Sequence, residues 1–285
     1  MNFRLAIFST FRDEDAFTLF RSIYQSIVNN QIKGKISFIF CNRENGENSL
    51  TDRLLREVEK YSIPLLCFSS RQFDSFLRKQ GVKESQQLNK DSPRLLEWRE
   101  EYDRQVIQRV EKFPVDLIVF AGYMLITGKE LCSRYDMINL HPAPPGGPRG
   151  AWEEVIWELM AQKSAEAGAM MHLVSPELDQ GPVVSYCTFS IQGKEYQEPW
   201  HRLKEELKNK NIREIKRESY RTHPLFCKIR EEEFRREIPL VLLTLREFTE
   251  GRIKILNKKP FYYSKKGSCL SQEIENYLMQ THNNF

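Results

Sequence analysis

The sequence predicts a doubly wound α/β fold, in which helices cover both faces of a mostly parallel sheet, followed by a helical C-terminal extension. Through residue 180, short apolar runs alternate with longer amphipathic segments, as in successive βαβ units. The run LIVFA within 116–122 is apolar at every position, as expected of a strand that has helices on both faces. After Gln192 the strand-like runs give way to charged helical stretches, which mark the extension.

The first three strands are short runs rich in Ile, Phe and Leu, separated by more polar segments. They are predicted at 3–10, 35–42 and 63–69. Between the first two, Phe20, Ile23 and Ile27 recur at spacings of three and four, which predicts an amphipathic helix. A second helix is predicted over SLTDRLLREVEKYS, at 49–62.

The clearest helix signal begins at Asp91. Ser92 is the predicted N-cap, and Pro93 occupies the first helical position, where its missing N–H costs nothing. One face of this helix is apolar and carries Leu95, Trp98, Tyr102, Val106 and Val110. The helix leads into 116–122, which we expect to be the central strand of the sheet.

The second half of the chain supplies three further strands and a closing helix. The strands are predicted at 137–141, 167–174 and 183–191, and the closing helix and strand over IPLVLLTLREFTEGRIKI. We therefore predict a core at 1–190 and a C-terminal extension at 191–285 that packs on it. The extension includes a basic segment at 201–236 and the closing helix and strand at 236–255.

Composition predicts a globular protein of the reducing cytoplasm with no membrane partner. The longest apolar stretch, 116–126, is far short of the roughly 20 residues that a transmembrane helix needs. The N-terminus places acidic residues directly after a short apolar run, unlike a secretory signal. The 6 cysteines are widely spaced, without a metal-ligand or disulfide pattern, so we expect free thiols and no metal site.

Charge is mild overall but unevenly distributed. The net charge of +4 is too small to indicate nucleic-acid binding by itself. The segment 201–236 carries 12 Lys and Arg against 7 Asp and Glu. We interpret this segment as a solvated helical face, so nucleic acid is not a predicted partner, although tRNA stays open.

The chemistry-bearing residues begin at the end of the strand MINLH. Asn139 and His141 are two residues apart and therefore project from the same face of the strand, and Pro142 ends the strand pairing. In open parallel sheets, ligands bind at the carboxyl edge, so this position makes His141 a site candidate. The alternative is a structural histidine beside a turn.

Asp179 supplies a carboxylate in a turn just before Gly181. A carboxylate next to His141 would raise the pKa of the imidazole and fix its orientation. Asn139 would then donate to an oxyanion. Since no serine or cysteine adjoins His141 in the sequence, the set favours acyl transfer without a covalent enzyme intermediate, although a nucleophile could approach in space.

These motifs resemble the folate-dependent formyltransferase superfamily. The family's strand end corresponds to Asn139-Leu140-His141-Pro142, and its later loop to Leu178-Asp179-Gln180-Gly181-Pro182. VDLIVFAGYMLI and IPLVLLTLREFTEGRIKI are similar to further family segments. The resemblance implies a Rossmann-like formyltransferase fold and transfer of a formyl group from 10-formyltetrahydrofolate, the co-substrate, to a small-molecule amine.

The resemblance also implies roles for individual residues. Asn139 and His141 would stabilise the tetrahedral oxyanion, and Asp179 would hold His141 charged. Folate would bind between two segments, Tyr123, Met124, Leu125, Ile126 and Thr127 in one and Val174, Ser175, Pro176, Glu177 and Leu178 in the other. The residues implied for the acceptor side are Thr10, Phe11, Arg12, Gly122, Pro142 and His172.

The chain departs from the family around the acceptor. Where the nearest branch, which formylates glycinamide ribonucleotide in purine synthesis, has a glycine-rich phosphate turn, residues 9–15 contain no glycine and three acids. The glutamate with which this branch binds the acceptor ribose is not evident in the sequence, unless Glu233 replaces it. The loop at 144–147 is Pro-Pro-Gly-Gly, and Arg149-Gly150-Ala151 resembles methionyl-tRNA and sugar-nucleotide formyltransferases. We therefore expect the formyl chemistry to be kept and the acceptor site to be altered.

Other functions remain compatible with the sequence. A formyltetrahydrofolate hydrolase would use water in place of the amine. A methionyl-tRNA or sugar-nucleotide formyltransferase would differ in its acceptor, and a non-catalytic folate binder would not need the three residues. An unrelated α/β protein would require the ordered motifs to be accidental. The sequence also leaves a homodimer open.

Overall fold

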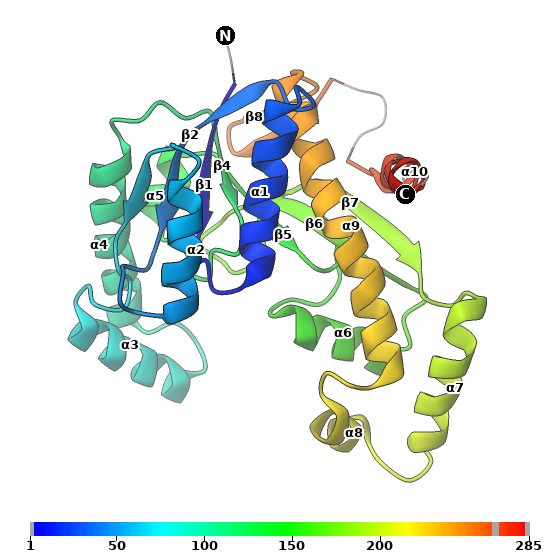
Figure 1. The fold of residues 1–285 in the computed structure, drawn as a ribbon. Helices are drawn as coiled ribbons and strands as arrows, with labels where there is room; N and C mark the ends of the chain where they lie inside the picture. The colour runs from blue at the N-terminus through cyan, green and yellow to red at the C-terminus, as the bar shows by residue number, and fades with distance from the viewer. Residues whose placement is uncertain (1–2, 264–267, 283–285) are drawn as a thin grey trace. The chain divides into compact units, whose positions relative to one another are not determined.

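The computed structural model describes residues 3–263 and 268–282 and contains a seven-stranded sheet (Figure 1). The strand order is β3-β2-β1-β4-β5-β6-β7, so the predicted central strand is the middle one. The strands are β1 Phe3–Ser9, β2 Gly34–Cys41, β3 Leu65–Cys67, β4 Leu117–Phe120, β5 Met137–His141, β6 Glu166–Leu173 and β7 Val183–Ser190. Strands β3, β2, β1, β4 and β5 run parallel, and β7 is antiparallel to β6. The predicted mostly parallel α/β fold is confirmed.

The chain forms two compact units whose segments alternate along the sequence. The first consists of the chain up to Asn139, Leu173–Pro182 and Phe248–Phe261. The second consists of Leu140–His172, Val183–Glu247 and the described residues from Tyr262 onward. Division of the chain into a core and an extension at residue 190 stays a prediction.

The first unit is built around β1. Ala6 and Phe8 belong to the hydrophobic cluster that includes one face of α4, and the alternating residues Leu5 and Ile7 are also fully buried. Both faces of β1 are therefore covered, as in a doubly wound sheet. The helices of this unit are α1 Glu14–Val28, α2 Ser49–Glu59, α3 Ser75–Leu88, α4 Pro93–Val110 and α5 Lys129–Arg134.

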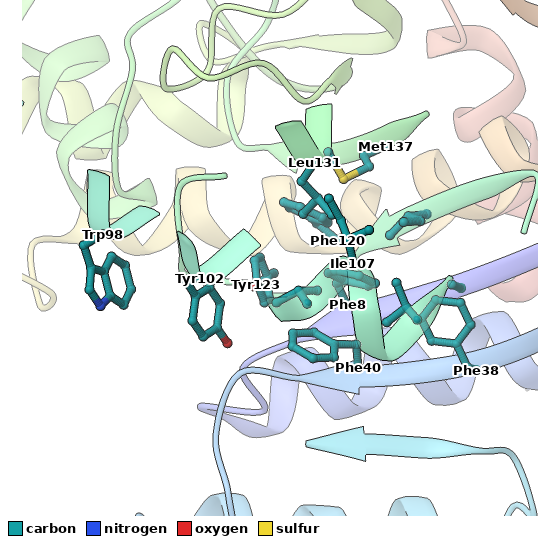
Figure 2. Packing of buried hydrophobic residues seen from close by; sticks show 14 residues of the cluster. Phe8, Phe38, Phe40, Trp98, Tyr102, Ile107, Phe120, Tyr123, Leu131 and Met137 are labelled. Atoms are coloured by element: carbon teal, nitrogen blue, oxygen red, sulfur yellow. The ribbon is translucent and has the colours of Figure 1, made fainter. Parts of the chain in front are cut away.

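Helix α4 forms as its sequence predicts. Ser92 is the N-cap, and its hydroxyl accepts a hydrogen bond from the backbone N–H of Leu95. Trp98 and Tyr102 are buried and stack with ring centroids 5.3 Å apart. Figure 2 shows these two rings in the same cluster as Phe8. This packing joins α4 to the sheet.

Helix α3 has no predicted counterpart, because only Gly81 among its residues is buried and the apolar period is absent. It pairs with α4 through close backbone approach. A Cβ at Gly81 would lie 2.7 Å from the backbone nitrogen of Leu95, and Ser92 Oγ donates to the Gly81 carbonyl at 2.9 Å. Glycine therefore lets the two helices approach where a larger residue would separate them.

The second unit confirms the predicted change to helical structure after Gln192. Its helices are α6 Trp152–Ala161, η1 Lys194–Tyr196, α7 Gln197–Glu206, α8 Ile212–Ser219, α9 Pro224–Thr249 and α10 Ser271–His282. The last two residues of α9, from Phe248, are assigned to the first unit. Trp157, Leu225, Phe226 and Ile229 share one buried cluster. Helix α9 begins earlier than the predicted closing helix and continues through Pro239. None of the helices in the described ranges is long and apolar enough to cross a membrane.

The closing strand of the sequence pairs with a strand that was not predicted. Strand β8, Ile253–Leu256, forms a two-stranded sheet with β9, Lys259–Tyr262. The two residues between them, Asn257 and Lys258, have φ values of 51° and 57°. Left-handed conformations at both positions are typical of a two-residue hairpin turn.

Candidate active site

In the first unit, the loops that follow β1 and β4 are hydrogen bonded to each other. The backbone N–H of Thr10 donates to the Gly122 carbonyl at 3.1 Å. The backbone N–H of Met124 donates to Thr10 Oγ1 at 2.9 Å. Residues that the resemblance implies for the acceptor, Thr10 and Gly122, therefore contact one another and the first folate segment at the carboxyl edge of the sheet.

Phe11 and Arg12 differ in burial. Phe11 is fully buried and its ring packs edge-on to Phe20. Phe11 also has a φ of 43°, in the left-handed region that favours glycine. Arg12 is half-exposed and lies 3.3 Å from the Asp13 carboxylate.

Two of the acids in the turn after β1 have structural partners. Asp13 is the N-cap of α1, and its carboxylate accepts from the backbone N–H of Ala16 at 3.1 Å. Glu14 forms an ion pair with Arg53 on α2. These carboxylates therefore serve the helix start and the surface, as acids at a helix N-terminus commonly do.

The two predicted folate segments rest on one hydrophobic cluster. Leu125 and Val174 both pack against the cluster around Phe8. The backbone N–H of Val174 donates to the Met137 carbonyl at 2.8 Å, which ties the second segment to the start of β5. Met124 and Leu178, one from each segment, are 55% and 50% exposed. Exposed apolar side chains on both segments fit a ligand with a flat aromatic ring system.

The end of the first folate segment is held by acids of α4 that sequence analysis missed. Asp103 Oδ2 accepts the backbone N–H of Gly128 at 2.5 Å. The Glu100 carboxylate accepts the next two backbone N–H groups, from Lys129 at 2.9 Å and Glu130 at 3.3 Å. Burial raises the pKa of Asp103 to about 7. In the sequence, the signal for this role was the spacing of Glu100 and Asp103, two acids three residues apart on one helix. Many exposed helices share that pattern.

Asn139 and Asp179 also belong to the first unit. Asn139 is half-buried on β5 and is in register with Phe120 on β4. Asp179 is half-buried and has a φ of 52°. The loop that carries it is closed at its base, since the backbone N–H of Leu173 donates to the Pro182 carbonyl at 2.8 Å.

His141 and His172 belong to the second unit and are almost fully buried. Their ring centroids are 6.3 Å apart and the rings meet edge-on. His141 Nε2 lies 2.8 Å from the Pro148 carbonyl. Because a carbonyl only accepts, Nε2 carries the proton and donates, which leaves Nδ1 for other partners. Assembly of His141 with Asn139 and Asp179 into one site stays a prediction.

Glu233, considered above for the acceptor ribose, lies in the interior of the second unit. It is fully buried on α9, and its two carboxylate oxygens have no hydrogen-bond partner within the described part of the chain. Burial raises the pKa of this carboxyl well above its ordinary range. Glu233 is therefore an interior acid, in which burial disfavours the charged form, and not a surface carboxylate.

The basic segment carries much of its charge in ion pairs. Cations of α7, α8 and the adjoining turns lie within ion-pair distance of glutamates, namely Arg202, Lys208, Lys210, Lys216 and Arg221. Arg230, Arg235 and Arg236 on α9 are paired as well. This pairing fits the interpretation of the segment as a solvated helical face.

An open, mostly parallel sheet with candidate ligand loops at its carboxyl edge defines a doubly wound α/β protein. The model of the formyl transferase family matches residues 10–213, and the chain belongs to that family. The family predicted from the Asn139, His141 and Asp179 motifs is thereby confirmed.

Curated relatives match part of the chain. Phosphoribosylglycinamide formyltransferase of Escherichia coli K12 is 32% identical over 88 residues, which are 30% of this chain and 41% of that protein. The enzyme of the same name from Saccharomyces cerevisiae is 32% identical over 105 residues, 34% of this chain and 49% of that protein. The chain thus spans less than half the length of the curated relatives it matches.

Solved structures share the fold. Phosphoribosylglycinamide formyltransferase of Coxiella burnetii aligns with a TM-score of 0.62 at 16% identity, covering 94% of this chain and 99% of that one. A formyltetrahydrofolate deformylase of Burkholderia mallei aligns with a TM-score of 0.58 at 13% identity, covering 93% of this chain and 71% of that one.

Proposed function

We propose that the chain transfers a formyl group from 10-formyltetrahydrofolate to the amine of glycinamide ribonucleotide. The observation that carries the proposal is the formyl transferase family match, which spans Asn139, His141 and Asp179. The acceptor comes from curated relatives, several of which are named phosphoribosylglycinamide formyltransferase. All 6 cysteines are free thiols, which suits a cytoplasmic enzyme.

In the proposed reaction, the acceptor amine attacks the formyl carbon and a tetrahedral oxyanion forms. Asn139 donates a hydrogen bond to this oxyanion, and a charged His141 stabilises it. The bond from the formyl carbon to folate N10 then breaks, and the proton lost by the amine ends on N10. Asp179 favours the charged form of His141 and helps relay this proton.

His141 is prepared for this role by its contact with the Pro148 carbonyl. Since Nε2 donates to that carbonyl, this hydrogen bond fixes the orientation of the ring. The loop that supplies Pro148 is the Pro-Gly stretch in which this chain departs from its relatives. We therefore assign this loop a part in orienting the catalytic imidazole.

Folate is proposed to bind over the two segments that rest on the Phe8 cluster. The pteridine would lie against Met124 and Leu178, which are the exposed apolar side chains of those segments. Backbone groups of 123–127 would give it hydrogen bonds, because Asp103 and Glu100 hold the end of this segment in place. Thr10, Phe11, Arg12, Gly122, Pro142 and His172 are proposed for the acceptor side.

The decisive experiment incubates the full chain with 10-formyltetrahydrofolate, with and without glycinamide ribonucleotide, and follows tetrahydrofolate and the formylated product. Acceptor-dependent release of both products in equal amounts is expected. Release without any acceptor would instead indicate a hydrolase, and no release in either mixture would indicate a folate binder.

Asp179→Asn is expected to lower turnover by one or more orders of magnitude, and His141→Ala by about as much. Glu59→Gln, at an exposed position of α2, removes the same charge as the Asp179 change and should leave turnover within about twofold of the parent. If the Asp179 variant behaves like this control, Asp179 has no part in the chemistry.

The same preparation addresses the proposed partners. We propose a small-molecule acceptor and no nucleic acid, supported by the ion-paired cations of the basic segment. Saturable tRNA binding that falls steeply with salt would contradict this. A homodimer stays a prediction, which sedimentation of the purified chain decides.

A further inference from the structure

The loops that follow β1, β2 and β3 emerge side by side from one edge of the first unit. The strands are parallel and in register at their ends, Ser9 with Cys41 and Cys41 with Cys67. The loops after β2 and β3 are joined further, because the backbone N–H of Ser70 donates to the Asn42 carbonyl at 3.0 Å. Each of these loops carries an arginine: Arg12, Arg43 and Arg71.

Arg43 is held rigidly between two of these loops. Its side chain is buried, with the residue only 7% exposed, and its Nη1 donates to Thr51 Oγ1 at 2.7 Å. The same hydroxyl lies 3.0 Å from the Phe11 carbonyl, to which it donates. The Arg43 guanidinium is thus fixed beside the turn after β1, with Nε and Nη2 free of hydrogen bonds to the described residues.

This buried cation has no carboxylate within ion-pair distance in the described part of the chain. Burial lowers the pKa of Arg43, and the nearby Arg71 lowers it further. The two glutamates of the same loop hold its backbone: Glu44 accepts from Ser69 and Glu47 from Glu44. Arg71 is exposed and likewise has no ion pair among the described residues.

A buried guanidinium beside a second one is costly unless an anion joins them. The planar donor fork of arginine matches the oxygens of phosphate, and two or three forks surround a tetrahedral oxyanion better than a flat carboxylate. We propose that Arg43 and Arg71, joined by Arg12, form a binding site for a phosphate group, either free phosphate or a phosphate monoester on a larger molecule.

The binding experiment uses the full chain and titrates inorganic phosphate, ribose 5-phosphate and ribose at constant ionic strength. Saturable binding of both phosphates at concentrations up to about 10 mM, and none of ribose, is expected. Tighter binding of ribose 5-phosphate identifies a monoester site, and equal binding identifies a site for the free ion. Absence of saturable phosphate binding overturns the proposal.

Two variants and one control assign the binding to these residues. Arg43→Gln and Arg71→Gln are each expected to weaken phosphate binding by at least about tenfold. Arg21→Gln removes the same charge from an exposed position of α1 and should change it less than about twofold. Because Arg71 is exposed, its variant remains informative even if the Arg43 variant fails to fold. Equal effects of Arg71→Gln and Arg21→Gln would overturn the assignment.

That the phosphate belongs to the formyl acceptor rests on the proposed function and needs a separate measurement. Formyl transfer to glycinamide ribonucleotide should lose kcat/KM in Arg71→Gln by at least about tenfold, with folate binding unchanged. Phosphate binding without any formyl transfer would leave the arginine site intact and refute only the proposed function. If Arg71→Gln leaves kcat/KM for formyl transfer unchanged, the acceptor phosphate binds elsewhere.

Discussion

Replacing Asp103 with asparagine should change the stability of the protein in a pH-dependent way. Relative to the parent, the variant should gain stability as the pH rises from acid to alkaline. The carboxyl is fully buried and has a pKa of about 7, against an ordinary value of 3.8. Its Oδ2 accepts the Gly128 N–H, and an asparagine oxygen can do the same. The substitution therefore removes the charge and keeps the hydrogen bond.

The sign follows from proton binding. With a pKa raised in the folded state, Asp103 binds a proton between pH 3.8 and about 7 only when the chain is folded. Its contribution to stability is complete below pH 3.8 and is lost as the pH rises through about 7. Between pH 5.5 and 8, deprotonation of this carboxyl should lower the unfolding free energy of the parent by about 2 kcal/mol. The variant lacks the carboxyl and should not show this loss.

Urea unfolding at pH 5.5 and pH 8 measures the effect. The difference in unfolding free energy between Asp103→Asn and the parent should shift by about 2 kcal/mol in favour of the variant between these pH values. Glu101→Gln is the control, because a hydrogen bond from Arg104 lowers the pKa of that exposed carboxyl and keeps it charged at both. A difference for Asp103→Asn that is the same at both pH values would refute the reasoning.

Two glycine substitutions test close packing. In Gly81→Ala, the new Cβ would lie 2.7 Å from the backbone nitrogen of Leu95, so urea unfolding should show a loss of about 1–3 kcal/mol, and unchanged stability would contradict the close approach. In Gly147→Ala, the Cβ would lie 2.9 Å from the Pro144 carbonyl oxygen and displace the loop that orients His141. Formyl transfer should fall by about tenfold or more with little change in stability, and full activity would remove the loop from the mechanism.

Strands and amphipathic helices were predictable wherever one face packs against a core. Helix α4 was predictable because Trp98, Tyr102 and Val106 recur at helical spacing. All three residues are buried. Helix α3 gives no such signal, because it is held through the Gly81 backbone and hydroxyl groups. Its existence depends on contacts between segments, which spacing along the chain does not encode.

The residues of the candidate site also divide into those that the sequence predicted and those that it did not. Asn139, His141 and Asp179 were found because motifs with a fixed spacing carry them. Asp103 and Arg43 were missed because contacts with segments distant in sequence set their roles. Asp103 accepts from Gly128, and Arg43 binds Thr51 of α2, whose hydroxyl donates to the Phe11 carbonyl. A carboxylate in a helix and an arginine after a strand are common, and only burial sets these two apart.

The turn after β1 shows why the acceptor question could not be decided from composition. It lacks glycine, yet Phe11 adopts a left-handed φ of 43°, held by a ring that is fully buried. A left-handed residue of this kind costs about 1–2 kcal/mol, so the conformation persists only because packing of the ring offsets that cost. The backbone shape that glycine would favour is therefore present without glycine.

Charge at the carboxyl edge of the sheet could not be decided from composition either. Counting acids in 9–15 suggests repulsion of a phosphate, but Asp13 caps a helix and Glu14 pairs with Arg53. Two arginines that form no ion pair with any described residue, Arg43 and Arg71, come instead from the loops after β2 and β3. If anion recognition has moved from backbone N–H groups to guanidinium groups, it should weaken with single arginine substitutions, whereas a backbone cradle would tolerate them. The response to Arg71→Gln thus separates the two modes of recognition in a turn whose sequence supports neither on its own.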